Sequence, residues 1–200
     1  MIRNLGYCCI CLSLGKSVTT NRGTILRLFS IDRASELALQ NCYDLIKIME
    51  WNAKNGIKFF RLSSDIFPLA THGEVGYKLE ELPAFDQIKS LIGTAGTIAK
   101  ENGIRLSSHP GPFTILSSPK EKVVTDAIRD IELHSRIGDM LNCEGESLFN
   151  INFHMGSDYG DKSATAKRYI ENFSRLSENA RKRITIENDD KGKLFSVKDL

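Results

Sequence analysis

The chain has 200 residues, of which 41% are hydrophobic and 26% are charged, with a formal net charge of +2. This composition excludes a disordered or collagen-like chain, and the length is sufficient to bury a core, so we expect one domain over residues 1–200. The small net charge neither predicts nor excludes nucleic-acid binding, because a local basic patch matters more than the sum of charges.

The cysteines predict a protein that works in a reducing compartment. There are five of them, an odd number, and three are crowded near the start: Cys8, Cys9, Cys11, Cys42 and Cys143. Cys8 and Cys11 have CxxC spacing, but no second Cys/His pair follows at zinc-finger spacing, so we interpret the crowded group as small residues of a buried strand. The apolar N-terminal stretch is too short to span a membrane and is not followed by a small-residue cleavage site. We therefore expect a cytoplasmic protein that contacts no membrane and needs no obligate protein partner.

Strand-like and helix-like patterns alternate through the chain. Strands are predicted at 4–12, 57–64, 104–109, 147–156 and 183–189. Helices are predicted between them at 33–54, 83–101, 119–141 and 161–182, where apolar residues recur every three or four positions. Asp32 is the predicted N-cap of the first helix and Gly56 its C-terminal cap, while Ser196 is the predicted N-cap of a further helix.

The alternation predicts an α/β fold of the (β/α)8, or TIM, barrel type. The segments AKNGIKFFRLSS and AKENGIRLSS repeat one helix end, capping glycine and following strand. Repeated βα units build either a barrel or a doubly wound sheet. A closed barrel needs eight strands, so we expect only about the first five βα units here and a chain truncated at its C-terminus. A complete five-stranded open sheet is the alternative.

Potential metal ligands stand at the ends of successive predicted strands. His72 follows the second strand, His109 ends the third, His154 ends the fourth and Glu187 ends the fifth. In a parallel barrel these ends meet on one face, and imidazole with carboxylate is a donor set suited to Zn²⁺ or Mn²⁺. Each histidine alone could equally be a hydrogen-bonded structural residue. His134 lies within a predicted helix, and we interpret it as a packing residue.

The same face carries side chains that suit a nucleic acid. Tyr7, Phe113 and Tyr159 lie near the strand ends, where aromatic rings can stack on bases. Arg22 and Lys162 lie in loops at that face and could meet phosphates, and Lys162 also begins a predicted helix, whose N-terminus favours anions. The alternative is that these two cations are simply solvated.

Several motifs resemble the UV-damage endonuclease family. The motifs are GYCCICLSL with TTNR, WNAKNGIKFFRLSSDIFPLATH, LSSHPG, FHMGSDYGDK and ITIENDD, in this order over nearly the whole chain. The resemblance implies a TIM barrel related to endonuclease IV, with two or three divalent ions, most often manganese. It implies that the four strand-end residues named above are metal ligands, and that Tyr7, Asn21 and Arg22 line the DNA-facing side. Pro112 and Phe113, after HPG, would form the probe that enters the duplex at a lesion.

The chain departs from the family pattern at four positions. Pro112 replaces a glutamine, Cys11 an asparagine and Ser157 a glycine, and Gly23 interrupts the TTNRT motif. We expect the departures to affect lesion recognition more than metal binding.

The resemblance implies a DNA-repair endonuclease, acting on damaged double-stranded DNA of the nucleoid, that nicks the backbone 5′ to UV photolesions. Divalent ions would activate the attacking water, so no side chain is assigned as a separate general base. We expect these 200 residues alone to be inactive, because later strands of the family supply further ligands. The alternatives are a metal-dependent sugar isomerase or epimerase on the same barrel, and an inactive DNA-binding fragment.

Overall fold

Five parallel strands form a single sheet. The structure is a computed structural model that describes residues 4–143, 149–189, 191 and 194–200. The sheet order is β1-β2-β3-β4-β5, the same as the order along the chain. The strands are β1 (Leu5–Cys8), β2 (Ile57–Arg61), β3 (Arg105–Ser108), β4 (Phe149–His154) and β5 (Ile184–Glu187). The predicted α/β fold with five parallel strands is confirmed, and the strand order lacks the reversal of a doubly wound sheet.

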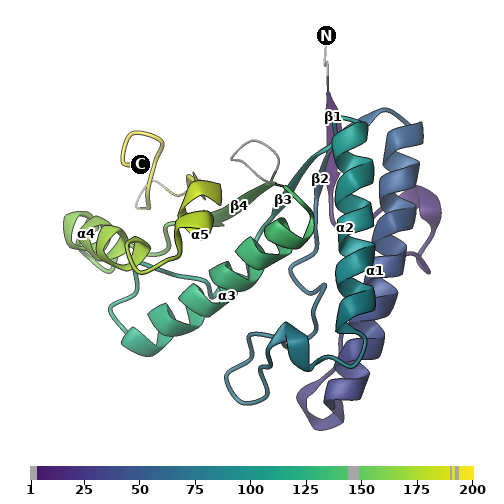
Figure 1. Ribbon diagram of the computed structural model, residues 1–200. Coiled ribbons are helices and arrows are strands. Elements are labelled where there is room, and N and C mark those ends of the chain that lie inside the picture. Colours follow the sequence, from purple (N-terminus) through teal and green to yellow (C-terminus); the bar gives the residue numbers. More distant parts are fainter. Residues whose placement is uncertain (1–3, 144–148, 190, 192–193) are drawn as a thin grey trace.

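Helices alternate with these strands along the chain. They are α1 (Ile31–Lys54), α2 (Phe85–Glu101), α3 (Glu121–Met140), α4 (Lys162–Phe173) and α5 (Glu178–Arg183), with short 3-10 turns at Leu12–Leu14, Leu26–Leu28 and Leu79–Glu81. Helix α1 packs on α2, α2 on α3, and α3 on α5, so that these helices lie side by side along one face of the sheet (Figure 1). Each crossover therefore returns to the same side of the sheet.

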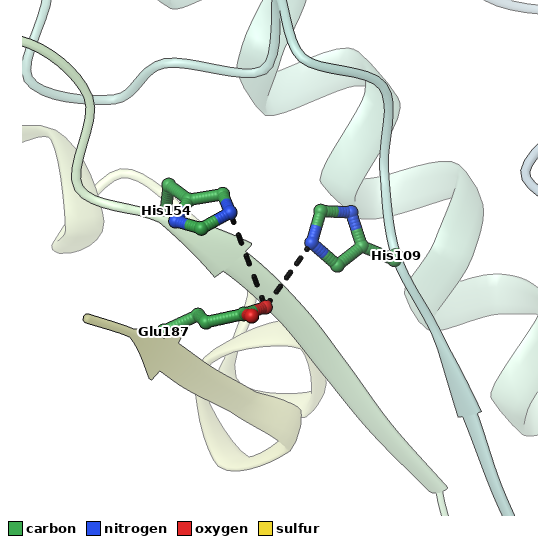
Figure 2. A group of neighbouring side chains, drawn as sticks. All are labelled: His109, His154 and Glu187. Carbon is green, nitrogen blue, oxygen red and sulfur yellow. Dashed lines mark ion pairs between the residues drawn. The ribbon is translucent and has the colours of Figure 1, made fainter. Parts of the chain in front are cut away.

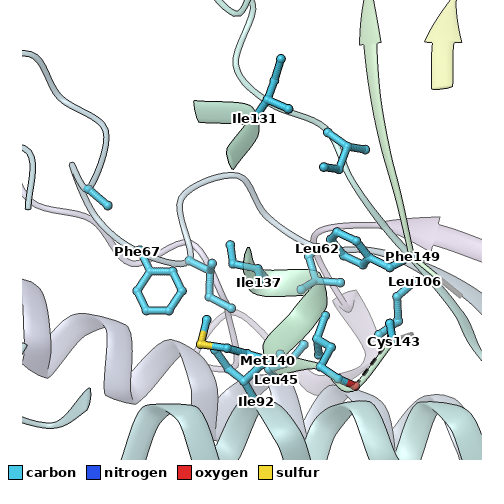
Figure 3. Close-up of a cluster of buried hydrophobic side chains, with 14 of the residues drawn as sticks. Leu45, Leu62, Phe67, Ile92, Leu106, Ile131, Ile137, Met140, Cys143 and Phe149 are labelled. Carbon is cyan, nitrogen blue, oxygen red and sulfur yellow. Dashed lines mark hydrogen bonds between the residues drawn. The ribbon is translucent and has the colours of Figure 1, made fainter. Parts of the chain in front are cut away.

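The core lies between the sheet and these helices (Figure 3). Leu45 of α1 and Ile92 of α2 are fully buried, as is Phe149 of β4. Burying a side chain of this size contributes about 1.5–3 kcal/mol relative to leaving it in water. The spacing of three and four between apolar helical residues places them on one stripe, which explains why the helices dock along a single face.

The first helix begins earlier than predicted. Ser30 is its N-cap, and the Ser30 side chain accepts a hydrogen bond from the Arg33 backbone N–H at 3.1 Å. Asp32 lies in the first turn instead, where a negative charge favours the helix dipole. At the other end, Gly56 has a φ of 69°, the left-handed conformation that the predicted C-terminal cap requires.

The predicted helix over 161–182 is wrong, because the chain forms two helices there, α4 and α5. Ser177 begins α5 by accepting a hydrogen bond from the Ala180 backbone N–H at 3.2 Å. The backbone N–H and hydroxyl of Ser177 also donate to Glu132 of α3, at 2.7 and 2.8 Å. Ser177 therefore caps the N-terminus of α5, and the helix that begins with α4 cannot continue through it. The apolar spacing nevertheless continues across the break between α4 and α5.

At the predicted further helix after Ser196, the structure describes one hydrogen-bonded turn, in which the Asp199 N–H donates to the Ser196 carbonyl at 2.9 Å. Residues 147 and 148 of the predicted fourth strand lie outside the described residues. No helix among the described residues is long and apolar enough to cross a lipid bilayer.

Candidate metal centre

Three of the predicted ligands lie together at the carboxyl ends of neighbouring strands (Figure 2). His109 follows β3 directly, His154 is the last residue of β4, and Glu187 is the last residue of β5. His154 and Glu187 are register partners, so their backbones are adjacent. Glu187 Oε2 lies 3.4 Å from His109 Nε2 and 4.0 Å from His154 Nε2. The imidazole centroids are 5.7 Å apart.

This spacing suits a shared divalent ion. Nitrogen and oxygen ligands lie about 2.0–2.2 Å from a zinc-like ion, so two ligands on neighbouring corners of its coordination shell are separated by about 3–4 Å. The separations of 3.4 and 4.0 Å between Glu187 Oε2 and the two Nε2 atoms fall in this range. Two imidazoles and a carboxylate form a donor set that suits Zn²⁺ or Mn²⁺. The residues present therefore fit the metal that the sequence predicts.

A neighbouring carbonyl holds the His109 imidazole in the tautomer that a metal ligand needs. His109 Nδ1 lies 2.9 Å from the Pro110 carbonyl oxygen, which can only accept, so Nδ1 carries the proton. His154 Nδ1 lies 3.5 Å from Asp189 Oδ1. With its proton on Nδ1, His109 keeps a free lone pair on Nε2, and the Asp189 carboxylate lies behind the His154 ring, where it favours the same tautomer.

Sequence reasoning missed two supporting residues. Asn152 Nδ2 donates to Glu187 Oε2 at 2.7 Å, and the Asn152 side-chain oxygen Oδ1 accepts from the Thr185 hydroxyl at 3.0 Å. Asp189 is the second, through its contact with His154. The signal was present, because Asn152 stands two residues before His154, on the same side of the strand, and Asp189 stands two residues after Glu187.

His72 lies apart from the three clustered residues. Its Nδ1 accepts a hydrogen bond from the Glu74 backbone N–H at 3.2 Å, so the neutral ring carries its proton on Nε2. In this arrangement Nε2 is a donor rather than a metal ligand. His72 instead lines a cavity of about 460 Å³ together with Phe113. The role of His72 as a ligand remains a prediction.

The residues after HPG are well placed to meet a large partner. The Phe113 side chain is 85% exposed, and Pro112 beside it is also exposed. Tyr159, on the loop after β4, lines a second cavity of about 310 Å³ with Phe113. The Arg168 guanidinium lies over the Tyr159 ring at 5.5 Å and supports it from α4. Two predicted aromatic contacts therefore lie on one surface.

The two predicted phosphate-binding cations are already paired within the chain. Arg22 donates to the carbonyls of Thr19 and Ser17 and forms an ion pair with Asp44 at 2.5 Å. Lys162 forms an ion pair with Asp199 at 2.9 Å. Arg22 thus closes the loop before α1 onto the helix. Each cation would have to leave its carboxylate, or share it, before it could bind a phosphate.

Tyr7 and Asn21 also make internal contacts. The Tyr7 hydroxyl donates to Asn52 Oδ1 of α1 at 2.7 Å, and burial raises the pKa of this phenol. The Asn21 side chain accepts from the Thr19 hydroxyl but is itself exposed. Asn21 is therefore accessible to a ligand, whereas the Tyr7 hydroxyl is directed at a helix.

His134 is buried, at 1% exposure, as its interpretation as a packing residue requires. Neither ring nitrogen has a hydrogen-bond partner among the described residues. Burial is the main cause that lowers the pKa of His134, so this side chain is neutral in the folded chain.

Comparison with known proteins identifies the family. The family model described as UV-endonuclease UvdE matches residues 3–200. The chain belongs to the UV-endonuclease UvdE family. A UV DNA damage endonuclease from Clostridium perfringens is 37% identical over 196 residues, which cover 98% of this chain and 45% of that protein. A UV-damage endonuclease from Neurospora crassa is 42% identical over 167 residues, covering 82% of this chain and 24% of that protein.

A solved structure of the same family has the same fold. The crystal structure of SacUVDE matches with a TM-score of 0.86 at 36% identity, covering 98% of this chain and 63% of that chain. The family resemblance read from the motifs is therefore confirmed. The chain spans less than half the length of the two UvdE relatives named above.

Proposed function

We propose that this UvdE chain is part of a metal-dependent endodeoxyribonuclease that nicks the DNA backbone 5′ to UV photolesions. The observation that carries the proposal is the cluster of His109, His154 and Glu187 at adjacent strand ends, with the spacing of shared metal ligands. The names of the relatives, UV DNA damage endonuclease and UV-damage endonuclease, supply the substrate class. Damaged double-stranded DNA inside the cell is accordingly the proposed partner.

The proposed cofactor is a divalent cation, and Mn²⁺ is the first candidate. Such an ion supplies Lewis-acid stabilisation and a water activated at neutral pH, so the site needs no separate side-chain base. His109 and His154 would each offer Nε2, and Glu187 would offer a carboxylate oxygen. Asn152 holds Glu187 by a hydrogen bond of 2.7 Å, which keeps the carboxylate between the two rings.

The proposed lesion contacts are Pro112 and Phe113. An exposed aromatic side chain can exchange stacking between bases for stacking on the protein. The family's glutamine is replaced here by Pro112, which has no side-chain hydrogen-bonding group. We therefore propose that this chain recognises a lesion by the shape and stacking of the distorted bases rather than by an amide at this position.

We also propose that the five strands belong to a (β/α)8 barrel. Parallel strands in chain order, with crossovers on one side of the sheet, are what such a barrel requires. In this arrangement the described residues supply part of the metal cluster. We propose that these 200 residues alone do not nick DNA, because a single three-residue site lacks the second ion that clamps the departing oxygen in two-metal nucleases.

The test is nicking of an end-labelled duplex that carries a defined photolesion, with Mn²⁺ and with a chelator. This chain is assayed alone and also as a chimera, in which it replaces the matching segment of the Clostridium perfringens relative. The intact relative is the positive control. We expect metal-dependent cleavage 5′ to the lesion by the chimera and none by this chain alone.

A second chimera carrying Glu187→Gln is the matched control, because it retains the size of the side chain and loses its charge. It should fold and bind duplex DNA but should not cleave. Cleavage by the Glu187→Gln chimera equal to that of the parent chimera would contradict the proposed role of the cluster. A folded parent chimera that binds Mn²⁺ and leaves the lesion strand intact would contradict the proposed reaction.

A further inference from the structure

One carboxylate of α3 is hydrogen-bonded to two different loops at the carboxyl end of the sheet. We call residues 62–84 the β2 loop and residues 109–120 the β3 loop. The Thr71 hydroxyl of the β2 loop donates to Asp130 Oδ1 at 3.1 Å. The Thr114 hydroxyl of the β3 loop donates to Asp130 Oδ2 at 2.6 Å. Each carboxylate oxygen therefore holds one loop.

The two threonines stand beside the predicted metal ligand His72 and the proposed lesion probe Phe113. Thr71 directly precedes His72, and Thr114 directly follows Phe113. All four residues line the cavity of about 460 Å³, and Asp130 lines it too. Asp130 therefore contacts the residue next to the predicted fourth ligand, His72, and the residue next to the predicted lesion probe, Phe113.

The far half of the β3 loop has other anchors. Arg168 and Asn172 of α4 donate to the carbonyls of Ser117 and Leu116, at 2.9 and 2.8 Å. The Ser117 hydroxyl donates to the Met155 carbonyl at 2.6 Å. These bonds fix the segment that leads into α3. Among the described residues, the bond to Asp130 is the side-chain tie nearest to Phe113.

The chemistry of the site explains why a carboxylate stands at this position. An ionised carboxylate can accept a separate hydrogen bond on each oxygen, and such charge-assisted bonds are about twice as strong as neutral ones. Thr114 is buried, at 6% exposure, so loss of the bond to Asp130 would cost its hydroxyl a partner in a largely desolvated position. One face of helix α3 is buried in the core, so both loops are attached to the same well-packed helix.

We propose that Asp130 is a positioning residue that couples the β2 loop to the β3 loop, and so fixes the Phe113 probe relative to the metal centre. The inference rests on the proposed function for its consequence at the lesion. Asp130 itself contacts neither the DNA nor a metal ion in the proposed arrangement. It acts through Thr71 and Thr114, and it sets discrimination between damaged and undamaged duplex rather than binding of the ion.

The first measurement is hydrogen exchange by mass spectrometry on the full chain. Asp130→Ala should speed exchange in both loops, while Thr71→Val should act on the β2 loop and Thr114→Val on the β3 loop. Asp130→Asn keeps the shape and one acceptor oxygen, and it provides a readable variant if Asp130→Ala does not fold. Asp139→Asn is the control, because Asp139 lies on the same helix, α3, and pairs with Arg183 of α5 rather than with either loop.

The second measurement is the affinity for a photolesion duplex divided by that for the undamaged duplex. Asp130→Ala should lower this ratio about tenfold, because the loop that carries Phe113 loses its charge-assisted hydrogen bond from Thr114, and should leave Mn²⁺ affinity unchanged. Faster exchange in one loop only, or in neither, would overturn the coupling. Faster exchange in both loops with an unchanged ratio of damaged-duplex to undamaged-duplex affinity would show that Asp130 is purely structural. This result would overturn its proposed role in positioning Phe113.

The two measurements also separate this inference from the proposed function. If the wild-type chain shows no preference for damaged duplex, the proposed lesion recognition fails and the positioning role fails with it. The exchange result does not depend on DNA, so it still decides whether Asp130 couples the loops.

Discussion

His154 Nδ1 lies 3.5 Å from Asp189 Oδ1, while the opposite ring nitrogen, Nε2, points toward Glu187 (Figure 2). The Asp189 side chain is only 15% exposed. A carboxylate behind an imidazole fixes the ring and keeps the proton on the nitrogen away from the ion. The arrangement is therefore that of a ligand held from behind.

Asp189→Ala should lower Mn²⁺ affinity by about 10–100-fold, the usual effect of removing a group that orients a metal ligand. Asp189→Asn should cost less, because its carbonyl oxygen can still accept from His154. The measurement is calorimetric titration with Mn²⁺. Asp86→Asn, at an exposed aspartate in the first turn of α2, is the control for the change in charge. Equal affinity in Asp189→Ala and wild type would show that Asp189 does not support the site.

Phe113→Ala should reduce the preference for damaged duplex without changing metal binding or stability. The side chain is 85% exposed, so truncation removes little packing, and the free energy of unfolding should change by less than about 0.5 kcal/mol. A lost base stack should lower affinity for the lesion duplex by about 1–3 kcal/mol. Phe113→Tyr keeps the ring and should behave as wild type. Competition binding with damaged and undamaged duplexes tests this, and an unchanged preference would exclude Phe113 as the probe.

Asp44 should make the N-terminal loop sensitive to acid. Burial alone would raise the pKa of Asp44, but hydrogen bonds from Lys47 and Arg22 hold the pKa below its usual range. A carboxyl group with a lowered folded-state pKa stabilises the chain above its unfolded pKa of about 3.9, and this contribution is lost as the pH falls through the folded pKa. Asp44→Asn should lower the free energy of unfolding at pH 7 by about 1–3 kcal/mol.

Urea unfolding between pH 2 and pH 7 measures this effect. The difference between wild type and Asp44→Asn should shrink as the pH falls below about 4, because protonation removes the same charge from the wild type. A difference that stays constant through this range would show that the ion pair with Arg22 is not the cause.

His134 should produce a second pH dependence, at a higher pH. Burial lowers the pKa of His134, with opposing effects from the nearby Asp130 and Asp65 and a further lowering from His109. The unfolded chain binds a proton there with a pKa of about 6.5, so stability is present above that pH and is lost as the pH falls below it. His134→Leu should flatten the melting temperature between pH 5 and pH 7. A curve parallel to that of wild type would contradict the assignment.

The sequence predicts the order and type of the elements well because each depends on local spacing. Apolar residues at three and four positions specify the stripe that each helix buries, and short apolar runs specify the strands. The break between α4 and α5 could not be read in this way. It depends on Ser177 meeting Glu132, a contact between residues 45 positions apart, and no local pattern records that contact.

The metal centre was predictable in part for the same reason. His109, His154 and Glu187 stand at strand ends, and parallel pairing brings such ends together. His72 lies within a long loop, so its position depends on turns and on hydrogen bonds such as the one from the Glu74 backbone N–H. The pairing of parallel strands does not predict these contacts. The ion pairs of Arg22 and Lys162 could not be predicted from the sequence, because their carboxylate partners are 22 and 37 residues away.

The most direct test of the proposed metal centre is a titration of this chain with Mn²⁺, in which electron paramagnetic resonance measures the ion that stays free. The proteins compared are the wild type, His109→Asn, His154→Asn and Glu187→Gln. We expect the wild-type chain to reduce the free-ion signal and each variant to restore it, while circular dichroism shows that all four are folded. Folded variants that bind Mn²⁺ as well as wild type does, or a folded wild-type chain that leaves the signal unchanged, would contradict the metal centre.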